Sequence, residues 1–243
     1  MTENHSSLAD DNWSIRFYEL QDESELGEAW CELQLRAEYS FFQSWGWMHS
    51  WIRTFPAGAS IYVLEVFYRE QRVGLSILGR NVVSAGGFFA SQAFFVSEVG
   101  NSDDDSLTVE HSGVLIQTGL EKEVLTRSFE HLLKIGLPWD ELLVSGVQVW
   151  HARAYCSAAQ SAGLVPIVRE KHPYYYVDLA DLRKRGVEYI DTLSNNTRYQ
   201  IRRSRRLYES RGDVVLLIAS TLSEALEFFE ELKRLHQSSW QSR

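Results

Sequence analysis

A run of arginines is the feature of this sequence that points most directly to chemistry. Six arginines and one glutamate between Ser194 and Arg211 give this stretch a net charge of +5, so the remaining residues carry −14 within the chain's total of −9. Arg198, Arg202 and Arg205 are spaced i, i+4, i+7, which places them on one face of a helix. Such a face suits a phosphate, a carboxylate or an anionic lipid head group. A solvated linker helix is the alternative interpretation.

Glu110 and His111 are the candidates for proton transfer, because a carboxylate or an imidazole can take a proton from an amine near neutral pH. They stand at the edge of a strand predicted over residues 109–116. Neighbouring residues of a strand point to opposite faces, so we do not expect the two to act as a dyad. An ordinary pair at the edge of a loop is the alternative. The sequence contains no G-x-S-x-G motif and no Cys/His nucleophile arrangement.

Three consecutive carboxylates, Asp103 to Asp105, raise the question of a metal site. Adjacent carboxylates do not converge on a cation without a special loop geometry, so we expect a solvated acidic loop and no metal site. The two cysteines, Cys31 and Cys156, lack metal-type spacing. They are expected to be small buried hydrophobic residues of a reduced protein.

Trp45, Trp47 and Trp51 lie within the stretch 43–55, which has a helical pattern and ends before Pro56. Trp47 and Trp51 are four residues apart and therefore share a helical face. We expect these aromatic residues to belong to the core, and the alternative is that they line an acceptor cleft.

Composition limits the possible functions. The chain has 243 residues, of which 44% are hydrophobic, so it can form one large domain or one domain and part of another. A net charge of −9 argues against a general nucleic-acid or membrane-surface binder. No apolar run approaches the roughly 18 residues of a membrane span, and the first residues are polar and acidic. We therefore expect a cytoplasmic protein without a transmembrane segment.

Hydrophobic periodicity over residues 12–180 predicts the element order β-α-α-β-β-β-α-β-α-β-β. The predicted strands are 13–20, 60–68, 71–83, 88–98, 141–147, 164–169 and 174–179, and the predicted helices are 22–37, 43–55, 120–135 and 149–162. A central antiparallel meander with interleaved helices predicts an α/β (α+β) fold with a mixed, largely antiparallel sheet flanked by helices.

The pattern starts again after Asp181. It predicts a helical region over 187–211 with a break at 194–196, a strand at 213–219, and a helix at 222–240 that buries Leu222 and Phe229. We expect a disordered tail (1–11), a first domain (12–180), an arginine-rich linker (181–212), and the first strand and helix of an incomplete second domain (213–243). The last helix meets no glycine or proline before Arg243, so we expect the chain to be cut short there.

Two segments resemble the FemAB-like acetyltransferases, a group within the GNAT superfamily that includes proteins named for cellulose biosynthesis. The first is LSNNTRYQIRRSRRLYESRGDVVLLIASTLSEALEFFEELKRLHQSSW, residues 193–240, which is similar to an S-x-N/K-x-R…R-R…R helix followed by a strand and an acidic helix ending near His and Trp. The second is SFFQSWGWMHSWIRTF, residues 40–55, which is similar to an early Q-S-x-x-W-x-x-x-W element of these proteins.

The resemblance implies two GNAT-like units and an acyltransferase. In that family acyl-CoA or aminoacyl-tRNA is the usual donor, and an amine or hydroxyl, on a small molecule or an envelope precursor, is the acceptor. It implies substrate-binding roles for five residues of this chain, Arg198, Arg202, Arg205, Trp47 and Trp240. No nucleic-acid partner is expected.

A GNAT unit holds the CoA pyrophosphate on a Q/R-x-x-G-x-G/A loop at a helix N-terminus. The nearest match, Gln71–Ser76, lies in a predicted hairpin, and the stretch before the helix at 120–135 carries Asp103–Asp105 instead. Clustered carboxylates repel a pyrophosphate, so we expect the acetyl-CoA or other acyl-CoA site to lie in the missing half. The alternative functions are a non-catalytic, degenerate GNAT-like module that binds an anionic partner through the arginine helix, and a nucleic-acid binder.

Overall fold

The computed structural model describes residues 12–56, 58–85, 89–101, 105 and 110–241. The chain forms two compact units, residues 1–170 and 171–243, which are described separately below. Among the described residues, no helix is both long and apolar enough to cross a membrane.

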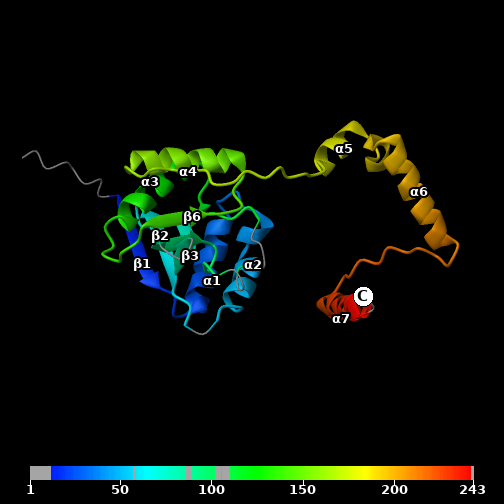
Figure 1. Cartoon of the computed structure of the whole chain (residues 1–243), viewed down its shortest axis with the longest axis horizontal. Helices are drawn as coiled ribbons and strands as arrows, with labels where there is room; N and C mark the ends of the chain where they lie inside the picture. The colour runs from blue at the N-terminus through cyan, green and yellow to red at the C-terminus, as the bar shows by residue number, and fades with distance from the viewer. Residues whose placement is uncertain (1–11, 57, 86–88, 102–104, 106–109, 242–243) are drawn as a thin grey trace, which may run out of the picture. The chain divides into compact units, whose positions relative to one another are not determined.

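The first unit is built on one mixed sheet (Figure 1). Its strands are β1 (Trp13–Glu19), β2 (Ile61–Tyr68), β3 (Gln71–Ala85), β4 (Phe89–Val96), β5 (Leu115–Ile116) and β6 (Glu141–Val144). They lie in the order β1-β2-β3-β4-β6, with β5 paired to β3. All these neighbours are antiparallel except β4 and β6, which run parallel. The predicted fold class, a mixed and largely antiparallel sheet flanked by helices, is therefore confirmed.

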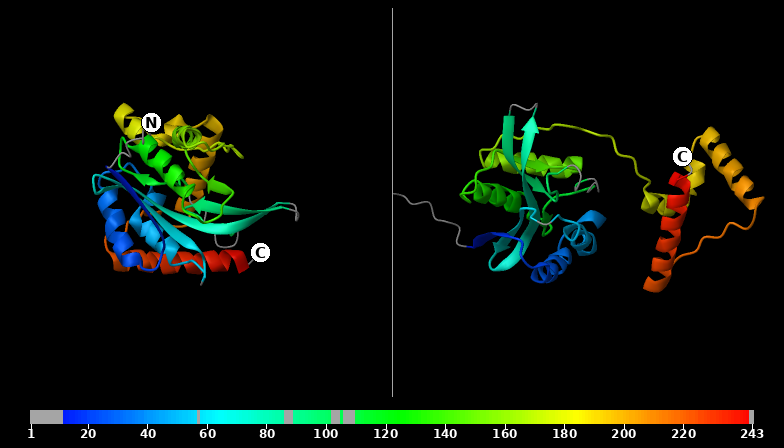
Figure 2. Two further views of the ribbon diagram at one scale, coloured as in Figure 1. Left: turned by 90° about the vertical axis from the view of Figure 1, so that its left-hand side faces the viewer. Right: turned by 60° about the horizontal axis from the view of Figure 1, so that its bottom comes forward.

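Helices cover both faces of this sheet (Figures 1 and 2). They are α1 (Glu23–Gln34), α2 (Trp45–Ile52), α3 (Glu121–Leu132) and α4 (Val149–Ser161), and a 3₁₀ turn, η1 (Phe41–Gln43), precedes α2. On β2, Val63 packs with α1 and α2, and its neighbour Leu64 packs in a cluster with Leu132 of α3. This strand is buried on both faces, which is why its sequence is an almost continuous apolar run.

Local signals explain where these elements begin and turn. Asp22 caps α1 by accepting a hydrogen bond from the Ser24 N–H at 2.8 Å, as an N-cap residue does. Between β2 and β3 the chain reverses through Arg69 and Glu70, whose φ angles are 49° and 65°. Two left-handed residues in a two-residue loop match the twist of the strands, and the predicted hairpin is confirmed.

The regular secondary structure of the second unit is helical over its described residues. It contains α5 (Leu179–Arg185), the 3₁₀ turn η3 (Tyr189–Thr192), α6 (Asn195–Glu209) and α7 (Leu222–Gln241). Asp178 caps α5 and Ser194 caps α6, which confirms the predicted helix start near 194–196. The prediction that α7 buries Leu222 and Phe229 is wrong, since both side chains are exposed.

Three predicted strands, at 164–169, 174–179 and 213–219, are absent from the described structure. Their alternating or apolar sequences are typical of strands, but a strand forms only where a neighbour completes its hydrogen bonds. In the first of these segments Val165 and Ile167 are 83% and 78% exposed, so neither packs against the sheet. The second segment, 174–179, overlaps the start of α5, because Asp178 caps this helix by accepting the Asp181 N–H.

Candidate functional site at the ends of β4 and β6

The parallel strands β4 and β6 separate at their carboxyl ends. Their pairing runs from Ala93 opposite Glu141 to Val96 opposite Val144. The next residue of β4, Ser97, has a φ of 57° and donates its N–H to β3, at Ile77 O, 2.9 Å away. The chain after β4 therefore turns toward β3 and leaves the end of β6.

Glu98 lies at this point of separation. Its Oε2 accepts a hydrogen bond from Ser145 Oγ, on the residue after β6, at 3.0 Å. Burial raises the pKa of the Glu98 carboxyl above its usual value, the Ser145 hydrogen bond opposes this rise, and the negative charge of Asp105 adds to it. A half-buried carboxyl with a raised pKa is a stronger base than a solvated one.

Asp105 binds three consecutive backbone amides just after Glu98. Its Oδ1 accepts the Val99 N–H at 2.7 Å, and its Oδ2 accepts those of Gly100 and Asn101 at 2.7 and 3.0 Å. Gly100 has a φ of 83°, and a Cβ there would lie 2.3 Å from the Phe95 ring, so this position requires glycine. Successive N–H groups that converge in this way form an anion-binding concavity, and here the anion is a carboxylate of the chain itself.

A carboxylate of the chain also binds an N–H just before α3. Glu121 Oε1 accepts the Gly119 N–H at 2.9 Å, and Glu123 adds a second acid to the first turn. A ligand phosphate would find the N–H groups of Gly119 and of Val99–Asn101 already bonded. Asp103 and Asp104, which the sequence grouped with Asp105, lie outside the described residues.

His111 lies in a turn rather than on a strand, because β5 contains only Leu115 and Ile116. The strand predicted over 109–116 is therefore wrong for Glu110 and His111, and the argument that they point to opposite faces no longer applies; residues 106–109 lie outside the described part. Glu110 is exposed and His111 is half-buried with a φ of 57°.

The turn at His111 is held from two sides. Its N–H donates to Gly146 O, just beyond β6, at 2.8 Å, and its carbonyl accepts the Ser40 hydroxyl at 3.2 Å. Ser112 Oγ donates to the carbonyl of Ser145, the partner of Glu98. The structure therefore brings the predicted residue His111 and the unpredicted residue Glu98 to the same end of the β4–β6 pair.

Two polar side chains, the buried Gln43 and the partly buried Tyr155, fix the residues that follow. Gln43 Nε2 donates to Gly113 O at 3.4 Å, and the Val114 N–H donates to Tyr155 Oη on α4 at 2.7 Å. Burial raises the pKa of Tyr155 to about 12, so its phenol stays protonated at neutral pH. These contacts connect the turn to the α1–α2 connection and to α4.

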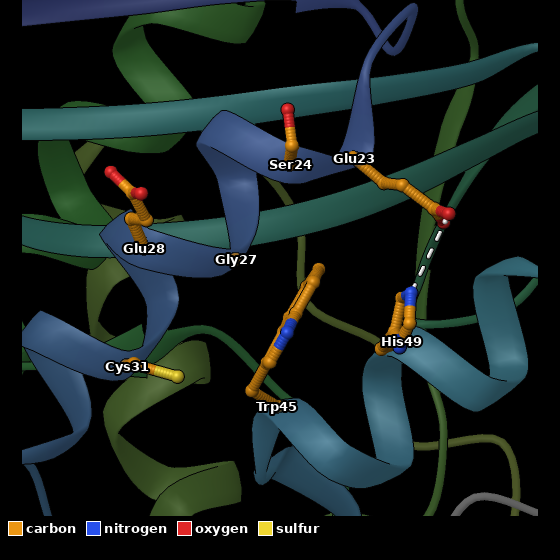
Figure 3. A pocket seen from close by; sticks show the side chains of 7 residues that line it. All are labelled: Glu23, Ser24, Gly27, Glu28, Cys31, Trp45 and His49. Carbon is orange, nitrogen blue, oxygen red and sulfur yellow. Dashed lines mark ion pairs between the residues drawn. The ribbon is translucent and has the colours of Figure 1, made fainter.

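A second concave region, with a volume of about 450 Å³, lies between α1 and α2 (Figure 3). Its lining residues are Glu23, Ser24, Gly27, Glu28, Cys31, Trp45 and His49. His49 Nε2 lies 3.5 Å from Glu23 Oε1, and the imidazole stacks on the Trp45 ring with centroids 5.2 Å apart. The expectation that Cys31 is buried is wrong, because it is exposed here; Cys156 is partly buried, and both cysteines are free.

The three tryptophans around α2 have different surroundings. Trp45 lines the pocket, Trp51 is buried in the core, and Trp47 contacts Phe41 and Phe42 at centroid distances of 5.5 and 4.9 Å. In the second unit Trp240 is exposed and stacks near His236 at 5.7 Å. Trp47 and Trp240 thus belong to different units.

The predicted arginine face of α6 is partly satisfied within the second unit. Arg198 donates to the carbonyls of Asp191 and Leu193 at 3.1 Å, and Arg205 Nε donates to Glu209 Oε1 at 2.7 Å. The Arg202 side chain forms no ion pair or hydrogen bond with the described residues. The same holds for the side chains of Arg203 and Arg206. No group of metal-ligating side chains is present in the described part of the chain.

Sequence reasoning missed Glu98, Ser145 and Tyr155. A weak signal for Glu98 exists, since it is the single charged residue in the largely apolar stretch AFFVSEV, residues 93–99. Nothing in the sequence indicates that Ser145 meets it, because the two residues are 47 positions apart.

No protein-family model and no curated protein sequence matches the chain. Among solved structures it is similar to an aminoglycoside acetyltransferase from an uncultured soil metagenomic sample, in complex with trehalose, at 13% identity and a TM-score of 0.37, covering 70% of this chain and 98% of that one. The same enzyme in complex with sisomicin gives 12% identity, a TM-score of 0.37, and coverage of 70% and 99%. Glucosamine-6-phosphate N-acetyltransferase from Arabidopsis thaliana gives 14%, 0.34, and coverage of 67% and 99%. Likenesses of this size do not identify the function of this chain.

Proposed function

We propose that the complete protein is an N-acyltransferase of the GNAT type, which transfers an acyl group from acyl-CoA to an amine or hydroxyl acceptor in the cytoplasm. The observation that carries the proposal is Glu98, a half-buried carboxyl with a raised pKa where the parallel strands separate. An ammonium group must lose a proton before its nitrogen attacks the thioester. Glu98 takes that proton, the C–N bond forms as the C–S bond breaks, and the CoA thiolate leaves.

The alternative bases are Glu110 and His111. Glu110 is exposed, so it lacks the partly buried environment that is typical of a catalytic carboxylate. His111 shares the end of the β4–β6 pair with Glu98 through its bond to Gly146. We assign the base to Glu98 and propose that His111 acts beside it.

The experiment is a kinetic comparison of the intact protein with its Glu98→Gln and Glu110→Gln variants. Acetyl-CoA and a panel of primary amines, including amino sugars and envelope precursors, are supplied, and the released thiol is measured. We expect Glu98→Gln to lower kcat/KM by about 10²–10⁴ and the exposed control Glu110→Gln to leave it unchanged. Equal kcat/KM for the wild type and Glu98→Gln across the pH range would remove Glu98 from the chemistry.

We propose that the diphosphate of acyl-CoA is bound outside the first unit. In the resembling family a loop before a helix N-terminus holds the diphosphate, and in the matching stretch of this unit Asp105 and Glu121 already bind the N–H groups of Val99–Asn101 and of Gly119. Isothermal titration of this chain with acetyl-CoA tests this, and micromolar binding that shifts the amide resonances of Val99–Asn101 would contradict it.

The acceptor's anionic groups are assigned to α6. Arg202 is the central residue of this assignment because its side chain has no partner in the described part of the chain. The side chains of Arg198 and Arg205 already bond to other residues of the second unit. Trp47 and Trp240, each within its own unit, remain proposed substrate-binding residues. Arg202→Gln should raise KM for an anionic acceptor, and it should do so more than Arg205→Gln, whose side chain is paired with Glu209.

The filled N–H groups also favour a second candidate function, a non-catalytic GNAT-like module that binds an anionic partner through α6. This candidate predicts that the intact protein binds inorganic pyrophosphate without turning over acetyl-CoA. Its binding should weaken in Arg202→Gln and in Arg206→Gln. Turnover that depends on Glu98 excludes it.

A further inference from the structure

The segment after β4 is bent twice within a few residues. Ser97 has a φ of 57° and Gly100 a φ of 83°. A non-glycine residue in the left-handed region costs about 1–3 kcal/mol and persists only where its surroundings impose it. The segment therefore needs fixed points on both sides of Glu98.

The first fixed point is β3. The Ser97 N–H donates to Ile77 O at 2.9 Å, and the carbonyl of Glu98 accepts the Gly79 N–H at 3.1 Å. A Cβ at Gly79 would lie 2.2 Å from that carbonyl oxygen, so β3 can approach this closely only because it carries a glycine here. These contacts fix the backbone up to Glu98.

The second fixed point is Asp105. The amide that follows Glu98, that of the buried Val99, and the next two amides all donate to this one carboxylate at 2.7–3.0 Å. Without an acceptor, three N–H groups that converge on one point would be left unsatisfied, each at a cost of about 1–3 kcal/mol where it is buried. Asp105 is the acceptor that satisfies these N–H groups and so stabilises this bend.

We propose that Asp105 is a positioning residue for Glu98: by binding the amides of Val99–Asn101 it holds the bend after β4 that brings the Glu98 carboxyl to Ser145. This inference rests on the proposed role of Glu98 as the base. It assigns Asp105 to the support of that base rather than to a metal site or a solvated loop.

The charge of Asp105 acts in the same direction as its geometry. The groups around Glu98 are the Ser145 hydroxyl from the end of β6, the side-chain-free Gly79 from β3, the Asp105 carboxylate, and the turn at His111 that bonds to Gly146. Of these, Asp105 raises the pKa of Glu98, which brings the carboxyl closer to the pH at which a general base is most effective. Loss of the charge should lower that pKa.

The experiment compares Asp105→Ala and the isosteric Asp105→Asn with the matched control Asp140→Asn. Asp140 also accepts a backbone N–H, that of Gln92, at 2.8 Å, but at the opposite end of the β4–β6 pairing. Carboxyl ¹³C NMR titration of Glu98 and the amide resonances of Val99–Asn101 are measured without any substrate. With acetyl-CoA and an accepted amine, kcat/KM is measured against pH.

We expect both Asp105 variants to shift the Glu98 titration and the acidic limb of the pH profile to lower pH. We expect kcat/KM to fall about 10- to 100-fold, as for other residues that orient a catalytic group. Added formate should occupy the amides in Asp105→Ala and return their resonances toward wild-type positions, which a purely structural loss would not allow. The Asp140 control should leave the Glu98 titration unchanged.

An unchanged Glu98 titration with unchanged Val99–Asn101 amides in both variants would overturn the proposal, as would an equal change in Asp140→Asn. If the wild type transfers no acyl group to any amine, the proposed function fails. The two NMR measurements still decide the role of Asp105, so the two failures are distinguishable.

Discussion

Removal of one hydroxyl, in Tyr155→Phe, tests how the turn beside the candidate site is held. Tyr155 Oη accepts the Val114 N–H at 2.7 Å. Phenylalanine fills the same space but leaves this N–H without an acceptor. The cost of an unsatisfied buried donor is about 1–3 kcal/mol, so we expect the free energy of unfolding to fall by that amount at neutral pH.

The same residue predicts a pH dependence. Burial raises the pKa of Tyr155 from 10.0 to about 12, so the folded state holds the proton more firmly than the unfolded state. This contribution is fully present below pH 10 and is lost as the pH rises through about 12. Each unit corresponds to about 1.4 kcal/mol, and the stability difference between wild type and Tyr155→Phe should therefore shrink by about 1.4 kcal/mol between about pH 8 and pH 11.

Urea unfolding followed by tryptophan fluorescence measures this difference, because all tryptophans except Trp240 lie in the first unit. Subtraction of the variant from the wild type cancels the titration of the other tyrosines and of the lysines. A loss below about 0.5 kcal/mol at neutral pH, or a difference that stays constant up to pH 11, would refute the assignment of Tyr155 as the buried acceptor of this turn.

Three further substitutions test the packing around the site. Gly79→Ala should destabilise the first unit by about 1–3 kcal/mol or more, because its Cβ would lie 2.2 Å from the Glu98 carbonyl; urea unfolding measures the loss. Gly46→Ala on α2, where no atom lies within 4 Å of the new Cβ, is the glycine control and should stabilise by roughly 0.5 kcal/mol. Arg72→Met should cost about 3–5 kcal/mol, because it leaves Glu65, which is 4% exposed and 2.9 Å from Arg72 Nε, as an unpaired buried charge. A thermal melt of Arg72→Met that matches the wild type would contradict this last expectation.

Much of the fold follows from local sequence signals. Asp22 and Ser194 begin helices because their side chains accept backbone N–H groups one turn ahead. The apolar, β-branched and aromatic residues of Ile61–Tyr68 and of the strand that follows, with a two-residue link between them, predict the hairpin. These features depend on residues within a few positions of one another, which is why the sequence is sufficient to predict them.

The wrong strand predictions depend on contacts that a sequence pattern does not contain. Residues 213–219 have five consecutive exposed apolar side chains, and a propensity scale cannot distinguish such a run from a buried strand. The deciding factor is whether another strand offers N–H and C=O groups at the correct spacing. The described structure provides no such neighbour for this segment.

The candidate site could not be predicted from the sequence for the same reason. Glu98 and Ser145 meet only because β6 pairs in parallel with β4, and their separation of 47 residues leaves no local trace. His111 was identified by its residue type alone, and its turn beside Gly146 contradicts the strand on which it was placed. Topology, rather than side-chain chemistry, assembles this site.

Asp105 offers a second physical cause for the expectation that the first unit does not hold a pyrophosphate. The sequence predicts that clustered carboxylates keep a pyrophosphate away by repulsion. In the structure Asp105 occupies the amides that such a ligand would need. A tethered group acts at an effective concentration in the millimolar range or above, so a free phosphate must compete with a carboxylate that is always present. Asp105→Asn would remove repulsion but keep a carbonyl acceptor in place, whereas Asp105→Gly would remove both. Binding of inorganic pyrophosphate to the glycine variant alone would therefore identify occupancy as the cause, and equal binding to both would identify charge.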